Sequence, residues 1–260
     1  MWISLDDIRY RLYELNEIGW WAHWAEVRWF DEISYVILSN DFPEPLFNHC
    51  SLLAPHPDPE EIVEKATSAF DAVKAEPSFI LPEAPSFMAL RESLLSRGYI
   101  RIDRMAVLEL ASPDLPSCGS FELMKANEVE EWASSYLLSF YGELSLLSPV
   151  TKAVAKASED PACRLLLAKL EGKPVGTLAL YQTDRFAGAY CVGVLPAYRK
   201  AGVATALLQL ASQLAEKDGK KLILQTFLSE SVEGFYLKRG FMKVFIKDVF
   251  VKRATNIPGS

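Results

Sequence analysis

The segment YCVGVLPAYRKAGVATALLQLASQLAEKD, residues 190–218, combines an apolar strand, a tight turn and an amphipathic helix. The Val-rich run Tyr190–Leu195 is typical of a buried strand. Pro196 ends that strand, because proline has no N–H to donate to a ladder. The following helix has one apolar stripe, formed by Val203, Leu207, Leu210 and Leu214. The segment therefore predicts a strand–turn–helix unit packed against a core.

The turn in this unit has the properties of a phosphate-binding site. The first N–H groups of a helix lack intrahelical acceptors, and the helix dipole makes that end electropositive. Gly202 has no side chain and Ala204 a very small one, so a phosphate can approach the backbone closely. Arg199 and Lys200 add two positive charges beside the same helix end.

The spacing of these residues separates this turn from two common nucleotide-binding loops. A Walker A loop needs Gly-x-x-x-x-Gly-Lys-Ser/Thr, and a dinucleotide fingerprint needs Gly-x-Gly-x-x-Gly; neither occurs here. Arg/Gln-x-x-Gly-x-Gly/Ala after a strand ending in Val-x-Pro does occur, and it resembles the pyrophosphate-binding motif of the GNAT acetyltransferase superfamily. A basic residue in an ordinary βα turn is the alternative interpretation, but the position between V-L-P and an amphipathic helix favours the family. The matching residues are Val194, Pro196, Tyr198, Arg199, Gly202 and Ala204.

The resemblance implies a site for acetyl-CoA as co-substrate, with no metal. In the family the strand before the turn splays from its neighbour, so that free backbone groups face the pantetheine arm, and Gly193 is compatible with a local bulge there. Ser229 stands where many members have a cofactor-contacting Asn. The implied cofactor-binding residues are Val192, Gly193, Val194, Arg199, Lys200, Ala201, Gly202, Val203, Ala204, Thr205 and Ser229.

The resemblance also implies a general acid. Many members have a tyrosine four residues before the glycine that precedes the last strand, and Tyr236 occupies that position. A neutral phenol can protonate a leaving thiolate at pH 7, although packing on the sheet would also explain an aromatic residue here. No general base is evident, and Glu143 and Tyr190, acting through a water, are weak candidates. We expect the acceptor site to be bordered by residues 142–149 and by Trp132, Tyr136 and Phe140.

The order of expected elements predicts an α+β fold with a mixed sheet, in two related parts. Residues 120–251 follow the GNAT order, and residues 111–120 have the composition of a linker. The first part repeats the second half of that order, and Arg97-Gly98-Tyr99 corresponds to Arg239-Gly240-Phe241 at an offset of 142 residues. An unrelated α+β domain is the alternative. We predict a degenerate GNAT-like domain over 1–112 and a catalytic GNAT domain over 118–260.

The first part differs where the cofactor would bind. LAPHPDPEEIV replaces VLPAYRKAGVA, so Pro57 and Pro59 remove amides, while Asp58, Glu60 and Glu61 would repel a phosphate. We therefore expect one cofactor site per chain, with the first part structural or forming one wall of the acceptor site. The tryptophan-rich run over residues 19–29 is predicted to be a strand and loop around a small core.

Composition excludes several other classes. A net charge of −7 argues against a nucleic-acid partner. The acidic N-terminus is unlike a signal peptide, and no run is long enough to span a bilayer, so a cytoplasmic protein is expected. His23 is expected to be structural, since no second ligand has metal-binding spacing near it. The four cysteines have neither zinc nor disulfide spacing: Cys50, Cys118, Cys163 and Cys191.

Together these patterns predict an acetyl-CoA-dependent N-acetyltransferase that transfers acetyl directly to a small-molecule or peptide amine, with Tyr236 as general acid. The missing base and Ser229 leave open a second class, a non-catalytic acyl-CoA-binding or scaffolding module. The sequence leaves the acceptor and the oligomeric state undetermined.

Overall fold

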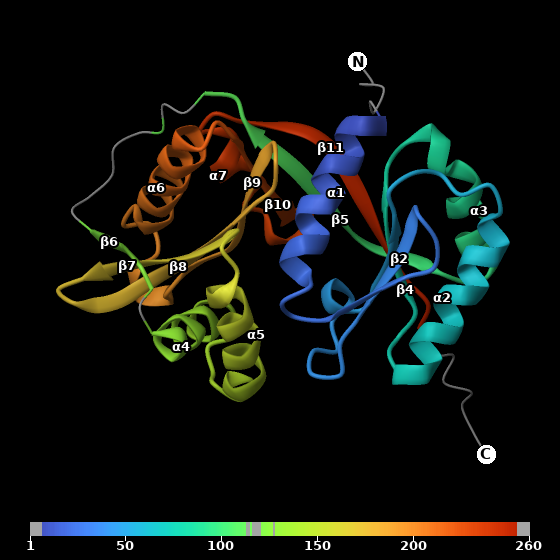
Figure 1. Ribbon diagram of the computed structural model, residues 1–260, viewed down its shortest axis with the longest axis horizontal. Coiled ribbons are helices and arrows are strands. Elements are labelled where there is room, and N and C mark those ends of the chain that lie inside the picture. Colours follow the sequence, from blue (N-terminus) through green and yellow to red (C-terminus); the bar gives the residue numbers. More distant parts are fainter. Residues whose placement is uncertain (1–6, 113–114, 116–120, 127, 254–260) are drawn as a thin grey trace.

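The computed structural model describes residues 7–112, 115, 121–126 and 128–253, whose strands form one mixed sheet (Figure 1). Eleven strands lie in the order β1-β2-β3-β4-β11-β5-β10-β9-β8-β7-β6. The strand bounds are β1 Glu26–Trp29, β2 Ser34–Leu38, β3 His49–Leu52, β4 Ser78–Pro82, β5 Ile100–Leu110, β6 Glu122–Lys125, β7 Cys163–Leu170, β8 Lys173–Gln182, β9 Phe186–Val194, β10 Lys221–Phe227 and β11 Phe241–Val251.

Helices pack against the strands of both halves of this sheet. In Figure 1, α2 and α3 lie over the strands of the first half, and α4, α5, α6 and α7 lie around those of the second. The helix bounds are α1 Asp7–Trp21, α2 Pro59–Val73, α3 Met88–Ser96, α4 Val129–Phe140, α5 Leu147–Glu159, α6 Val203–Lys217 and α7 Glu233–Leu237. The fold is thus the predicted mixed α/β type.

The last strands of the two halves are exchanged. β5 ends the first half but pairs with β10 of the second, while β11 ends the second half but pairs with β4 of the first. β5 and β11 pair antiparallel with one another along nearly their whole length. The two halves therefore share one continuous sheet and are joined through its central strands.

The first half has the element order that the internal comparison predicted. β3 pairs with β4 in parallel, as β9 does with β10, and a helix connects the strands of each pair. Asp58 followed by Pro59 is the sequence pattern of a helix start. Helix α2 does begin there, with Pro59 in its first turn and the Asp58 carboxylate accepting from the amides of Glu60 and Glu61. These amides are already satisfied, so they are not free to bind a phosphate.

Three local predictions need correction or lie outside the described residues. Trp20 and Trp21 end helix α1 rather than lying in a strand or loop, because Trp20 packs parallel to Tyr190 with 5.2 Å between ring centroids. The sequence predicts a helix over residues 231–239 that ends at Gly240; the observed α7 is shorter, since a 3₁₀ turn over 228–230 precedes it. Asn127, with Glu130 three residues further on, has the sequence pattern of an N-cap for α4, but it lies outside the described residues.

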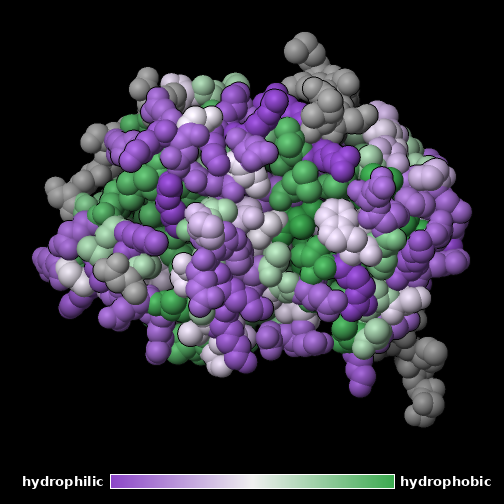
Figure 2. All heavy atoms as spheres, viewed as in Figure 1, coloured by the Kyte–Doolittle hydropathy of each residue, from purple (hydrophilic) through white to green (hydrophobic). Residues whose placement is uncertain are grey.

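Helix α1 connects the two halves on the side of the sheet seen in Figure 1. Its Asn16 amide donates to the carbonyls of Tyr181 and Phe186 in the second half, at 3.2 and 3.3 Å. Its Tyr10 hydroxyl donates to the Leu52 carbonyl in the first half at 2.8 Å. Figure 2 shows apolar side chains gathered over this helix in the middle of a largely hydrophilic face. The first helix thus belongs to the cores of both halves.

Candidate active site

The strands β9 and β10 separate in the middle of the sheet. They pair in parallel only between residues 186–189 and 221–224. Beyond Leu224, β10 continues alongside β5, while β9 continues alongside β8. The backbone of residues 190–194 therefore has no strand partner on the β10 side. This is the splay that the sequence could not show.

A bulge in β9 lies directly at the splay. Residues 177 and 179 of β8 pair with residues 193 and 190 of β9, so β9 has one extra residue, and Cys191 adopts a positive φ of 51°. The Thr177 hydroxyl donates to the Cys191 carbonyl at 3.0 Å. Gly193 is required beside the bulge, because a Cβ there would lie 2.8 Å from Phe140 and 2.9 Å from Ser139 Cβ. The bulge suggested by Gly193 is confirmed.

The turn after β9 presents free amides at the start of α6. Gly202 has φ 95°, a conformation that glycine adopts without strain, and it precedes the first helical residue, Val203. The amide of Ala206 is the first to bond back into the helix, to the Gly202 carbonyl at 3.0 Å. By helix geometry the amides of Val203, Ala204 and Thr205 therefore have no intrahelical acceptor. This arrangement fits a pyrophosphate.

The side chains around this turn have structural contacts of their own. Arg199 donates to the carbonyls of Ser139 at 2.9 Å and Val194 at 3.3 Å, so it fixes the turn against α4 and β9. The buried Thr205 hydroxyl accepts from Arg239 Nε at 2.7 Å, linking the start of α6 to the end of α7. Lys200, with φ 67°, is exposed. The side chains of Arg199 and Thr205 thus stabilise the conformation of the turn, whereas a phosphate would be bound by backbone amides.

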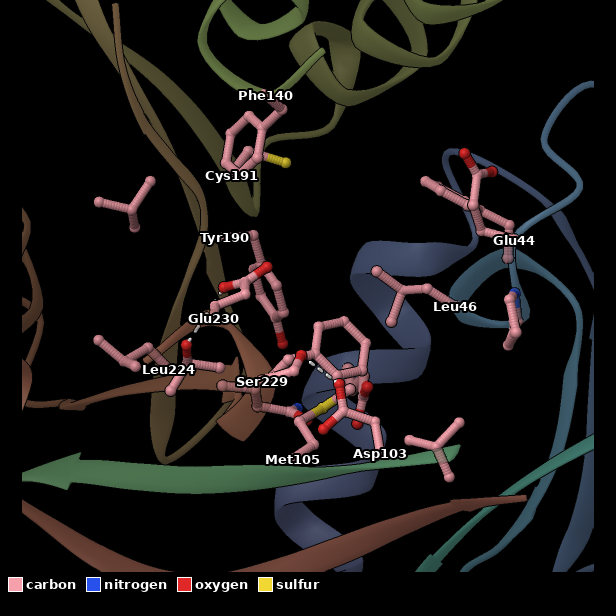
Figure 3. A pocket seen from close by; sticks show the side chains of 18 of the residues that line it. Glu44, Leu46, Asp103, Met105, Phe140, Tyr190, Cys191, Leu224, Ser229 and Glu230 are labelled. Carbon is pink, nitrogen blue, oxygen red and sulfur yellow. Dashed lines mark hydrogen bonds between the residues drawn. The ribbon is translucent and has the colours of Figure 1, made fainter. Parts of the chain in front are cut away.

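A cavity of about 430 Å³ lies at the splay, and both halves line it. The second half contributes β9, β10, α4 and α7, including Val192, Ser229 and Tyr236. The first half contributes α1, the segment 44–47 and β5, which enters through the strand exchange. Figure 3 shows these side chains facing a common space from the two halves.

Tyr236 is in the cavity wall and only 8% exposed. Burial raises the pKa of its hydroxyl to about 12, so the phenol is neutral and can donate a proton at pH 7. Its ring packs edge-on against Phe235 and Phe241. Ser229 also lines the cavity, and its hydroxyl donates to the carboxylate of Asp103 on β5 (Figure 3).

The weak candidates for a general base have different positions. The Glu143 side chain is exposed, accepts from Ser145, and does not line the cavity. Tyr190 lines it, but burial raises the pKa of its hydroxyl well above the usual value, and that hydroxyl donates to Asn16 at 2.7 Å. A Tyr190 phenolate is therefore not available as a base near neutral pH.

The expected border of the acceptor site is present only in part. Tyr136 and Phe140 line the cavity, but Trp132 is fully buried behind them and donates to the Leu166 carbonyl at 3.1 Å. None of residues 142–149 is in the wall, whereas Tyr141 is.

Sequence reasoning missed the carboxylates of the cavity. Glu17, Glu44, Asp103 and Glu230 line it, yet they come from α1, a turn, β5 and the segment before α7. Partial burial raises the pKa of Glu230 above its usual value, although this side chain retains solvent exposure. Ser229 was the nearest sequence signal, since it is adjacent to Glu230. The other three have no motif spacing, because only the tertiary fold brings them together.

The described residues hold no group of three or more His, Cys, Asp and Glu side chains arranged to bind a metal ion. Within the same residues no helix is both long enough and apolar enough to cross a bilayer.

Comparison with known proteins identifies a domain in the second half of the chain. Residues 126–241 match the model of the Acetyltransferase (GNAT) family, so this part of the chain is a GNAT acyltransferase domain. No curated protein matches the sequence significantly. Of the two functions that the sequence left open, the acetyltransferase domain at residues 126–241 supports the enzyme.

Solved structures show the same fold over nearly the whole chain. A GCN5-related N-acetyltransferase from Kribbella flavida is 17% identical, with a TM-score of 0.70 over 95% of this chain and 97% of that one. A functionally unknown conserved protein from Staphylococcus epidermidis is 17% identical, with a TM-score of 0.64 over 88% and 94%. A glucosamine N-acetyltransferase region in a fungal multi-domain β-N-acetylglucosaminidase is 15% identical, with a TM-score of 0.58 over 91% and 34%. Because coverage includes the first half, that half also has a GNAT-like fold.

Proposed function

We propose that the protein is an acetyl-CoA-dependent N-acetyltransferase that transfers the acetyl group directly to an amine. The observation that supports this most is the continuous arrangement of three parts. Free amides at the start of α6 lie at the end of β9, β9 separates from β10 beside them, and the cavity containing Tyr236 opens at that separation.

The residues present fit acetyl-CoA. The amides of 203–205 would bind the pyrophosphate, with Gly202 permitting close approach and Lys200 adding charge. The unpaired edge of 192–194 would hydrogen-bond the pantetheine arm. Ser229 would contribute a polar contact, although its hydroxyl already donates to Asp103. When bound, acetyl-CoA supplies the acetyl group as an activated thioester.

Two side chains of the cavity wall would move protons in this reaction. Tyr236 is neutral at pH 7 and would donate its proton to the departing thiolate sulfur. Glu230 would accept a proton from the attacking amine, since its raised pKa makes it a stronger base than an ordinary Glu. Glu230→Gln keeps the shape and removes the base, so it should lower kcat with little change in acetyl-CoA affinity.

The first half would bind no second acetyl-CoA. The corresponding helix α2 has its first amides occupied by the Asp58 carboxylate, and Glu60 and Glu61 add negative charge. Calorimetry should therefore give about one acetyl-CoA per chain. A stoichiometry near two would contradict this division of function between the proposed domains, 1–112 and 118–260.

Calorimetry with acetyl-CoA tests the cofactor site, and release of free thiol in the presence of amines tests the transfer. Gly202→Glu should abolish binding, because it places a carboxylate at the phosphate position and a side chain where φ is 95°. Gly172→Glu is the matched control: it has the same new charge and a similar φ of 75°, but lies in the β7–β8 turn with open space around it. Unchanged affinity in Gly202→Glu, or no binding by the unmodified chain at millimolar acetyl-CoA, would refute the proposal.

A further inference from the structure

The charge of the cavity wall has one sign. Its ionisable carboxylates are Glu17, Glu44, Asp103 and Glu230, and none of the Lys, Arg or His side chains in the described residues lines it. Such a wall favours a cationic ligand and disfavours an anionic one. The acids differ, however, in whether the protein already satisfies them.

Two of the four carboxylates are occupied by the protein itself. Glu17 forms a buried ion pair with Lys247, and Asp103 accepts the hydrogen bond from Ser229. Within the described part of the chain, Glu230 receives only one long hydrogen bond, 3.5 Å from the Thr226 hydroxyl. Glu44 and Glu230 lie on opposite sides of the cavity (Figure 3). These two are the carboxylates best placed to bind a ligand.

Buried acceptor atoms without donors add an independent observation. Glu44 Oε2 and Gln225 Oε1 are both inaccessible to solvent and have no hydrogen-bond partner among the described residues, and both residues line the cavity. A buried acceptor without a donor destabilises the folded protein, and more so when the acceptor is charged. A ligand that offers N–H donors in the cavity would remove this cost.

The wall between the two carboxylates is largely apolar. Its side chains come from α1, the segment 44–47, α4 and the strands, and they include Trp21, Leu46, Phe47, Phe140, Leu224 and Val249. A surface of this kind fits a hydrocarbon chain, whose burial is favourable in proportion to its area. The cavity thus has carboxylates on two sides and apolar contacts between them.

We propose that the acceptor is a linear diamine, protonated at the end that does not react. Its reacting nitrogen would lie beside Glu230 and Tyr236, its methylene chain along the apolar wall, and its ammonium group against Glu44. This inference rests on the proposed acetyl transfer and assigns substrate selection to the first half of the chain, which provides Glu44.

The test compares α,ω-diamines of propane to octane with monoamines of equal chain length. At least one diamine should have a kcat/KM about tenfold or more above that of the monoamine of equal length. A factor of this size is what one hydrogen bond to a charged group typically contributes to binding. Glu44→Gln should remove this preference by lowering the diamine kcat/KM to the level of the monoamine measured in the same variant; the substitution is isosteric, and among the described residues Oε2 has no hydrogen bond that could be lost. Glu92→Gln, an exposed residue of α3, is the matched control and should keep the preference.

Calorimetric titration of the same amines into the full chain separates this inference from the proposed reaction. Diamine binding that is stronger than monoamine binding and weakened by Glu44→Gln supports the diamine site, even if acetyl-CoA fails to bind. Acetyl transfer to amines with equal preference for monoamines and diamines would overturn the diamine site and leave the acetyltransferase intact. Retention of the preference in Glu44→Gln, or no binding of any diamine, would overturn it as well.

Discussion

Lys247 Nζ lies 2.7 Å from Glu14 Oε1, and each side chain is only 1% exposed. Lys247 also contacts the Glu17 carboxylate, one helical turn further along α1. These contacts join the first helix of the chain to its last strand, β11, which is one of the two exchanged strands. Two carboxylates share a single ammonium here, and burial raises the pKa of Glu14 despite the attraction of Lys247. The Tyr35 hydroxyl, 3.1 Å away, donates to Glu14 as well.

Substituting Lys247 by Met should destabilise the protein strongly. The methylene chain is retained, but two buried carboxylates lose their counter-ion, a change that typically costs about 3–5 kcal/mol. Urea unfolding at pH 7 measures it. Lys65→Met is the matched control, since Lys65 forms an ion pair with Glu61 on the surface of α2, and it should have a much smaller effect. Equal midpoints for the two variants would show that the buried pair contributes little.

Glu109 should give the unfolding free energy a pH dependence in the acid range. Burial alone would raise the pKa of this carboxyl, but hydrogen bonds from Lys221, Tyr13 and Arg9 together hold it below the ordinary value of 4.5. The stabilisation is therefore complete above about pH 4.5 and is lost as the pH falls through the lowered pKa of the folded state.

Glu109→Gln tests this directly. It should reduce the unfolding free energy at pH 7, and the difference from the unmodified protein should shrink as the pH falls below 4.5. Urea titrations at several pH values measure this difference. A difference that stays constant with pH would mean that Glu109 stabilises the fold through its shape rather than its charge.

The sequence predicted the elements of the second half well, because its apolar periodicity, turn glycines and prolines are local signals. The local patterns predict strands over 163–170, 221–227 and 241–251, and β7, β10 and β11 lie at these residues. The strand exchange had no such signal. β5 and β11 are both long and apolar, and pairing of either with β10 would satisfy the same local pattern. Only the complete sheet distinguishes the alternatives.

The candidate site was predictable where one segment provides it. Gly202 and the helix that follows form a motif in consecutive residues, and Tyr236 has a fixed position before Gly240. Glu44 and Asp103 could not be predicted in the same way. They reach the cavity because a strand and a turn of the first half pack against the second. Their role depends on contacts between residues more than 100 positions apart.

Tyr236→Phe should lower kcat by about 10²–10⁴-fold, the usual contribution of a positioned proton donor. Affinity for acetyl-CoA should change little, because the ring keeps its packing against Phe235 and Phe241. Thiol-release kinetics with a saturating amine measure kcat. Tyr181→Phe, outside the cavity wall, is the control and should retain full activity. Undiminished turnover in Tyr236→Phe would remove Tyr236 from the mechanism without removing the enzyme.

Gly193→Ala should distort the β9 bulge and weaken acetyl-CoA binding. The new Cβ would come within 2.9 Å of Ser139 Cβ and 2.8 Å of Phe140, so α4 must move away from β9. Thermal unfolding and calorimetry with acetyl-CoA measure the two effects. Gly234→Ala is the control, since its Cβ would meet no atom within 4 Å and lies in a helix, where Ala is favoured over Gly. Normal affinity in Gly193→Ala would show that the bulge is not needed for binding.

The strand exchange predicts that neither half folds alone. A fragment of residues 118–260 keeps β10 and β11 but loses β5, which pairs with both, so two long strands would have unpaired edges. A fragment of residues 1–112 likewise loses β11 from between β4 and β5. Each fragment by itself should lack a cooperative thermal transition. Mixed or co-expressed, the two fragments should form a one-to-one complex. The first fragment retains β5 and the second retains β11, and these two strands pair with one another.

Circular dichroism melting and size-exclusion chromatography of the separate and combined fragments test this expectation. In the combined sample, acetyl-CoA binding should return together with the cooperative transition, since the cavity needs walls from both halves. Fragments cut at residue 99 instead, so that β5 remains attached to the second half, are the informative control. The longer of these fragments, residues 100–260, keeps the pairing of β5 with β10 and β11, so it should fold better than 118–260. A stable monomeric fragment 118–260 with normal acetyl-CoA affinity would show that the exchanged strand is dispensable to the cofactor site.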